Sequence, residues 1–85
     1  AIDLARFAVA ASATHPAVLN AANEVLVDAF IAGEVPWLAI VDTVSTVVHE
    51  HEGVADPSLE DIVAAQRWAD QRARELVRAG QWKDM

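Results

Sequence analysis

The residues best suited to metal chemistry lie in the run HEHE at residues 49–52. Imidazole and carboxylate groups are common ligands of divalent metals. On a helix, side chains two positions apart point about 200° away from each other, so His49 and His51 share an ion only where the helix has unwound. The zincin pattern of two histidines four positions apart, with a glutamate beside the first, is absent. We therefore predict no metal ligand here and expect solvated residues at a helix end.

Neither the serines nor the glycines form a catalytic or phosphate-binding motif. The three serines, none of which follows the pattern of a nucleophile elbow, are Ser12, Ser45 and Ser58. The three glycines, which are too scattered to form a loop that binds phosphate, are Gly33, Gly53 and Gly80. We therefore predict no catalytic residue and no cofactor-binding residue in this chain.

A polar cluster interrupts the most strongly helical part of the sequence. Asn20, Asn23 and Glu24 are spaced i, i+3 and i+4, so they share one face of a helix. Asparagine is a mediocre helix former because its amide competes with the backbone. Such a group either forms an exposed polar face or makes directed hydrogen bonds to another surface. The small residues Ala21 and Ala22 favour close approach of another backbone, and therefore a contact surface.

Three tryptophans are the other unusual residues in a chain of this size. Trp68 stands beside an apolar stripe, and Trp37 stands where a helix is expected to begin, so we predict that both lie in the core or at its edge. Trp82 has no obvious core to join and is a candidate anchor for a partner.

The elements that position these residues are expected to be helices. Apolar residues recur at helical spacing in four segments, which cover residues 2–12, 17–32, 37–50 and 58–79. The connections between them are short, so successive helices should pack antiparallel. The sequence predicts an all-α fold, a small bundle of about four helices.

Local features mark the ends of these helices. Pro16 suits a first helical turn, and Gly33 and Gly80 suit left-handed caps after helix ends. Ser58 and Asp61 have the spacing of a capping box. The third helix is rich in β-branched residues, which favour strands, but Ile40-Val41 and Val47-Val48 break the alternation that a strand requires. We therefore predict a helix there also.

Length and composition limit the class of protein. A chain of 85 residues without cysteine, 54% apolar, is long enough for one small domain, which we place at residues 1–80 with a frayed tail at 81–85. No apolar run approaches the roughly 20 residues of a membrane span. No leader pattern precedes the first helix. We expect a cytoplasmic protein without a membrane partner.

Charge separates the last helix from the rest of the chain. The formal net charge is −7, which disfavours binding to a nucleic-acid backbone. Residues 1–65 contain ten acids and one base, Arg6, whereas residues 66–85 contain five bases and three acids. The basic last helix either pairs with the acidic remainder or presents a solvated face.

Several of these segments resemble the C-terminal region of 1-deoxy-D-xylulose 5-phosphate reductoisomerase. The most specific is PAVLNAANEV at residues 16–25, followed by AFIAG at residues 29–33. AIDLA at residues 1–5, WLAIV at residues 37–41 and the stretches SLEDI and AAQRWA after residue 57 occur in the family's order, most closely in actinobacterial members. The pattern departs from the family at Ala39, where an acidic or polar residue often stands, and residues 81–85 match nothing.

The resemblance implies that this chain is an accessory part of a larger enzyme. The family's enzymes combine an NADPH-binding domain, a central catalytic domain that binds a divalent metal (magnesium or manganese) and substrate, and a C-terminal helical domain. Only the last resembles this chain, so no catalytic, metal or cofactor residue is transferred to it. The implied parent is an oxidoreductase of isoprenoid biosynthesis, on the methylerythritol phosphate route, and this chain alone is expected to be inactive. Asn20, Asn23 and Glu24 are then predicted to contact the catalytic domain of the same parent chain.

Two other interpretations stay open at this stage. A stand-alone helical interaction module would use either the Asn20–Glu24 face or the arginines of the last helix. A small metal-binding protein would use His49, His51 and the glutamates beside them. The chain begins at Ala1, which indicates processing or a piece of something longer. A domain separated from its partner exposes its former interface, so a homodimer through that interface is also possible.

Overall fold

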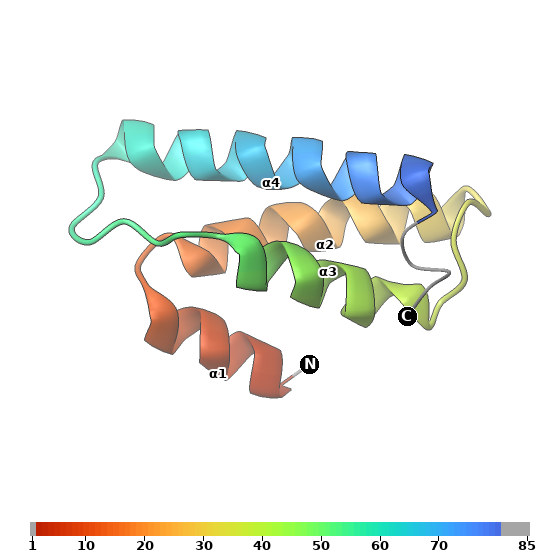
Figure 1. The fold of residues 1–85 in the computed structure, drawn as a ribbon, viewed down its shortest axis with the longest axis horizontal. Coiled ribbons are helices and arrows are strands. Elements are labelled where there is room, and N and C mark those ends of the chain that lie inside the picture. The colour runs from red at the N-terminus through yellow and green to blue at the C-terminus, as the bar shows by residue number, and fades with distance from the viewer. Residues whose placement is uncertain (1, 81–85) are drawn as a thin grey trace.

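Four helices form an antiparallel bundle (Figure 1). The computed structural model describes residues 2–80, and side chains from residue 3 to residue 80. The helices are α1 (Ile2–Ala11), α2 (His15–Ile31), α3 (Ala39–Glu50) and α4 (Leu59–Ala79). The prediction of an all-α bundle with about four helices is confirmed. The predicted tail, with Trp82, lies outside the described residues.

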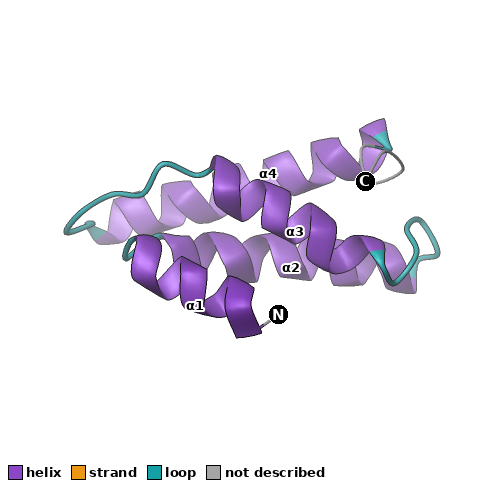
Figure 2. Cartoon of the chain, turned by 60° about the horizontal axis from the view of Figure 1, so that its bottom comes forward, coloured by secondary structure: helices purple, strands orange, loops and turns teal. Residues whose placement is uncertain are grey.

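α2 is the central element of the bundle. It packs against α3 and α4 and also receives α1. α1 lies along the first half of α2, as the two ribbon views show (Figures 1 and 2). α1 is consequently an edge helix, and Ala8 is the one residue among its described side chains that is buried.

The helix ends follow the local chemistry of the sequence. α4 begins with a complete capping box: the Asp61 amide donates to Ser58 Oγ at 3.1 Å, and the Ser58 amide donates to Asp61 Oδ2 at 3.0 Å. Gly33 and Gly80 have φ angles of 80° and 67°, the left-handed conformation that glycine adopts most easily. α2 begins two residues earlier than predicted because Pro16, which has no amide hydrogen, is tolerated in the first helical turn.

The core is aliphatic and built from small side chains. The largest side chains without exposure include Leu26, Val18, Val47 and Val48, from α2 and α3. α4 contributes a stripe of small residues, Ala65, Ala69 and Ala73, all of which are buried. Alanines at four-residue spacing allow the backbones of α2 and α4 to approach closely, because no long side chain separates them.

One predicted core position is wrong. Trp37 was expected in the core or at its edge but is 67% exposed. Leu59, which also stands at the beginning of a helix, is 77% exposed. Trp68, in contrast, is half-buried and packs against the core, as predicted. Helical spacing identifies the apolar face but does not reveal where the neighbouring helices end.

Candidate functional site

The polar face of α2 lies on the surface of the bundle. Asn20, Asn23 and Glu24 are all exposed. Their position follows from the opposite face of the same helix, where Val18 and Leu26 have no exposed surface. The three side chains therefore form a polar ridge along α2. We use this term for Asn20, Asn23 and Glu24 throughout.

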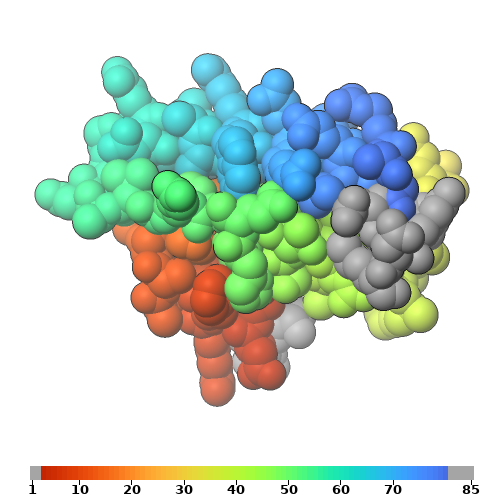
Figure 3. Space-filling model, viewed as in Figure 1, coloured from red at the N-terminus to blue at the C-terminus, as the bar shows by residue number. Residues whose placement is uncertain are grey.

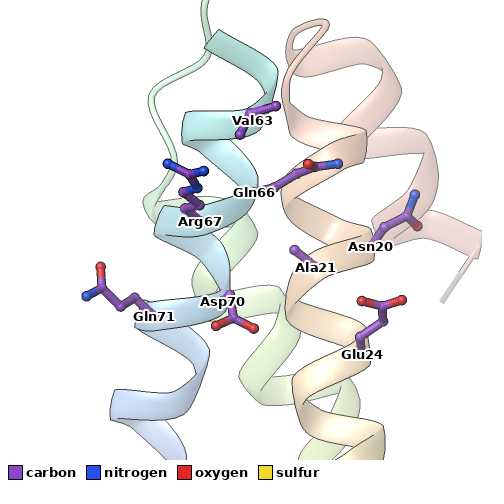
Figure 4. A pocket seen from close by; sticks show the side chains of 8 residues that line it. All are labelled: Asn20, Ala21, Glu24, Val63, Gln66, Arg67, Asp70 and Gln71. Atoms are coloured by element: carbon purple, nitrogen blue, oxygen red, sulfur yellow. The ribbon is translucent and has the colours of Figure 1, made fainter. Parts of the chain in front are cut away.

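The ridge borders an open groove between α2 and α4, with a volume of about 690 Å³. Asn20, Ala21 and Glu24 line it from α2, and Gln66, Arg67 and Asp70 are among the residues that line it from α4 (Figure 4). Gln66 extends from α4 toward α2 in the close view. The side chains around this α2–α4 groove are mostly polar.

A second groove lies on the other side of the ridge and is mainly apolar. Its volume is about 240 Å³. The residues that line it come from α1, α2 and α3: Leu4, Ala5, Leu19, Asn20, Asn23, Ile40, Val41 and Val44. Asn20 and Asn23 are the polar members of this set, which we call the α1–α3 groove. The ridge thus separates two grooves of different chemistry.

A buried polar cluster at one end of the bundle was not anticipated from the sequence. Thr14 Oγ1 bonds to His51 Nε2 at 2.8 Å and to Ser12 Oγ at 3.1 Å. Ser12 Oγ also bonds to His15 Nδ1 at 2.6 Å. Thr14 and His15 are buried, and the ring centroids of His15 and His51 lie 4.7 Å apart. We call Ser12, Thr14, His15 and His51 the histidine cluster.

The histidine cluster joins two connections that are distant in the sequence. Ser12 and Thr14 lie between α1 and α2, whereas His51 follows α3 and has an extended backbone. The Val54 amide also donates to Thr14 Oγ1 at 3.2 Å. Gly53 lies so close to Ser12 that a Cβ atom there would overlap the Ser12 side chain. The cluster therefore fixes the α3–α4 connection against the beginning of α2.

The two histidines of the HEHE run have different surroundings. His49 is exposed, stacks on Phe7 with ring centroids 4.3 Å apart, and donates from Nδ1 to the Ser45 carbonyl oxygen at 2.8 Å. His51 is half-buried, so the expectation of a solvated residue was wrong for it. Burial and the neighbouring His15 lower the pKa of His51 from its ordinary value of 6.5.

The described residues do not form a site for the metal or the NADPH that the resemblance implies. Among the residues that the structure describes, no group of three histidine, aspartate or glutamate side chains could bind a metal ion. Thr14 already occupies Nε2 of His51. The three glycines lie in separate connections or caps. The described residues therefore fit neither the metal nor NADPH, and we assign no catalytic step to them.

One ion pair links the basic last helix to the acidic remainder of the bundle. Arg72 of α4 donates from Nε and Nη2 to the two carboxylate oxygens of Glu50, at 2.7 and 2.9 Å. The hydrogen bond from Arg72 lowers the pKa of the Glu50 carboxyl, while Glu50 raises the pKa of the Arg72 guanidinium. Arg74 pairs with Asp70 within α4 at 2.9 Å. Part of the charge difference between the last helix and the rest of the chain is therefore used in an ion pair that joins α3 and α4.

Fold and site together define a small helical domain with two exposed grooves beside a polar ridge. No helix among the described residues is long and apolar enough to cross a membrane.

Comparison with known proteins identifies the family. A family profile described as the DXP reductoisomerase C-terminal domain matches residues 1–72. The chain is 52% identical to 1-deoxy-D-xylulose 5-phosphate reductoisomerase of Beutenbergia cavernae over 94% of its own length and 21% of that protein. It is 47% identical to the enzyme of the same name from Paenarthrobacter aurescens, over 92% of its length and 19% of that protein. No solved structure matches significantly.

The chain belongs to the DXP reductoisomerase family and corresponds to its C-terminal domain. It spans about a fifth of the length of the curated relatives it matches. The resemblance found in the sequence is thereby confirmed.

Proposed function

We propose that this chain is the accessory C-terminal domain of a 1-deoxy-D-xylulose 5-phosphate reductoisomerase and supports the enzyme's catalytic domain. The observation that carries the proposal is the family match over residues 1–72, on a chain about a fifth as long as its relatives. The exposed grooves are consistent with a domain that contacts a larger neighbour.

The parent enzyme would convert 1-deoxy-D-xylulose 5-phosphate to 2-C-methyl-D-erythritol 4-phosphate. The carbon skeleton would rearrange to an aldehyde, and NADPH bound by another domain would supply the hydride for reduction of that aldehyde to the alcohol. NADPH and magnesium or manganese belong to the other domains in this proposal. A cytoplasmic location is part of the same proposal, and cell fractionation tests it.

The polar ridge is proposed to contact the catalytic domain. Its three residues are exposed, so their amide and carboxylate groups are accessible to another surface. Asn20 lines both grooves, Glu24 lines the α2–α4 groove and Asn23 lines the α1–α3 groove. An amide offers both donors and an acceptor, which suits hydrogen bonding to exposed backbone.

The reading frame upstream of Ala1 in the source gene tests the proposed function. Several hundred codons for a dinucleotide-binding domain and a carboxylate-rich central domain are expected. The full enzyme should then turn over substrate, and the purified 85-residue chain should not. Turnover by the purified chain, or a start codon directly before Ala1, would refute the proposal. The second result would favour a stand-alone interaction module.

The ridge is tested with Asn20→Ala/Asn23→Ala in two settings. In the 85-residue chain both side chains are exposed, so the thermal midpoint should change little. In the full enzyme, the same variant should lose activity faster on heating, because contacts with the catalytic domain are lost. Equal behaviour in the two settings would show that the ridge is only a solvated face.

A further inference from the structure

An exposed apolar patch at the beginning of α3 has no partner within the described part of the bundle. Trp37 is 67% exposed, Leu38 is 74% exposed and Val41 is 48% exposed. With Ile40 and Asp42 these residues line a shallow hollow of about 460 Å³. Burial of a tryptophan alone removes roughly 150–250 Å² of surface from water. Contiguous exposed apolar residues of this kind are typical of an interaction surface. We call Trp37, Leu38 and Val41 the tryptophan patch.

Hydrogen bonds and buried neighbours fix the patch in its outward orientation. The Glu34 amide donates to the Ala29 carbonyl oxygen at 2.8 Å, which closes the end of α2. The Ala39 amide donates to the Pro36 carbonyl oxygen at 3.0 Å. Val35 and Ala39, on either side of the tryptophan, are buried. The exposed side chains are thus carried by a fixed backbone, so little conformational entropy is lost when another surface covers them.

The tryptophan patch is continuous with the α1–α3 groove. Ile40 and Val41 line both the hollow beside Trp37 and that groove. Asn20 and Asn23 stand at the groove's polar edge. An apolar centre with a polar rim is the usual anatomy of a protein interface. The α2–α4 groove lacks this arrangement, because Glu24, Arg67, Asp70 and two glutamines account for most of its lining.

The length of the relatives and the charge of the chain indicate which partner covers this face. About four-fifths of each relative lies outside the part that this chain matches, and α1, the first helix of this domain, borders the same groove. α1, in red, lies at the lower edge of the molecule in Figure 3. A second copy is disfavoured because the formal net charge is −7, so two copies repel each other, and the charged residue that lines the patch itself is the acidic Asp42.

We infer that the rest of the parent reductoisomerase docks on the tryptophan patch and the α1–α3 groove, with an apolar surface whose rim is basic. This inference rests on the proposed function and identifies which face of the domain the rest of the enzyme covers. The α2–α4 groove stays open to solvent in the assembled enzyme.

Hydroxyl-radical footprinting of the full enzyme and of the 85-residue chain tests this inference. Oxidation of Trp37 should fall several-fold in the full enzyme, whereas Trp68, already half-buried against the core, should change little. Protection at Gln66 and Arg67 instead, or no protection at Trp37, would overturn the inference. Concentration-dependent protection of Trp37 in the 85-residue chain would assign the patch to a second copy and would also overturn it.

A matched pair of variants separates docking from folding. Leu38 and Leu59 are 74% and 77% exposed, and each stands at the beginning of a helix, where an aspartate is favourable. Leu38→Asp and Leu59→Asp should therefore both be tolerated in the 85-residue chain. In the full enzyme only Leu38→Asp should lower the thermal midpoint, and equal effects would contradict the inference. If the gene encodes no further domain, the proposed function itself fails, which is a distinct result.

Discussion

Thr43 is the clearest energetic anomaly among the described side chains. It has no exposed surface, and its hydroxyl oxygen finds no hydrogen-bond partner among the residues described. Burial of an unpaired hydroxyl costs free energy, and valine has nearly the same shape without the polar atom. We predict that Thr43→Val raises the free energy of unfolding by about 1 kcal/mol, measured by urea denaturation with an unchanged m-value.

Thr46 in the same helix supplies the control for that experiment. Its hydroxyl donates to the Asp42 carbonyl oxygen at 3.1 Å. Thr46→Val should therefore bring no gain in stability. A loss of stability in Thr43→Val would show that the buried hydroxyl has a partner that the structure does not reveal.

His51 makes stability depend on pH. In the unfolded chain this histidine titrates near its ordinary pKa of 6.5, and in the folded chain its pKa is lower because of burial and His15. Between the two values the unfolded state binds more protons, so stability falls as pH falls below 6.5, down to the folded pKa. We predict a thermal midpoint that decreases across this window.

His51→Gln should flatten that decrease, because an amide can replace the hydrogen bond to Thr14 without binding a proton. Glu52 opposes the shift in His51, so its charge must be preserved in the variant. His49→Gln is the control, since His49 is exposed. A pH profile unchanged by His51→Gln would assign the dependence to another group.

The side chains that sequence alone located correctly are those whose surroundings are local. Asn20, Asn23 and Glu24 were placed on one face because helical spacing determines it, and Ser58 and Asp61 form the predicted cap. The bond between Thr14 and His51 spans 37 residues. No spacing rule connects such distant positions, so the histidine cluster could be found only in the folded chain.

At the scale of elements, Gly53 determines how closely the α3–α4 connection approaches the beginning of α2. A Cβ atom at this position overlaps the Ser12 side chain and crowds His15. We predict that Gly53→Ala costs about 1–3 kcal/mol of unfolding free energy, the usual range for overpacking. Chemical denaturation measures this loss.

The double variant Gly53→Ala/Ser12→Gly tests whether the contact with Ser12 causes the loss of stability in Gly53→Ala. Removal of the Ser12 side chain makes room for the new methyl group, so the double variant should be more stable than the sum of the two single losses predicts. Strict additivity would show that the cost of Gly53→Ala comes from backbone conformation and not from the close contact.

Arg72 stabilises the packing of α3 against α4 through its forked contact with Glu50. Arg72→Met should lower the free energy of unfolding by about 1 kcal/mol, the upper end for a surface pair. Arg74→Met, which removes a pair within α4, should have a smaller effect. Because the pKa of Glu50 is lowered from 4.5, the Arg72 contribution is present above that value and is lost as pH falls below it. A difference between the two variants that persists in strong acid would contradict this assignment.

The positions of the helices could be predicted from the sequence, whereas the part of each helix that its neighbours bury could not. Periodicity and capping residues are local properties, and they located all four helices to within two residues of the observed ends. Trp37 was predicted in the core or at its edge because it stands where a helix was expected to begin, yet it is exposed. Which part of a stripe is covered depends on the whole assembly, and most of the length of this chain's relatives lies outside the matched region.

At the scale of the whole molecule, stability should be uneven across the bundle. Ala8 is the one buried residue among the described side chains of α1, whereas α2 has six buried residues. Local opening costs little where few apolar contacts are lost. We therefore predict that the amides of α1 exchange hydrogen at least about tenfold faster than those in the middle of α2 in the 85-residue chain.

Hydrogen exchange of the full enzyme tests whether docking slows the fast exchange of the α1 amides. If the rest of the parent chain covers the α1–α3 groove, the amides of α1 gain protection while those of α4 beside Gln66 and Arg67 do not. Val9 is 73% exposed and does not line that groove, so Val9→Asp should leave both patterns unchanged. Exchange of α1 as slow as that of α2 in the 85-residue chain would show that the bundle opens as one unit, and the edge helix would then need no neighbour to stabilise it.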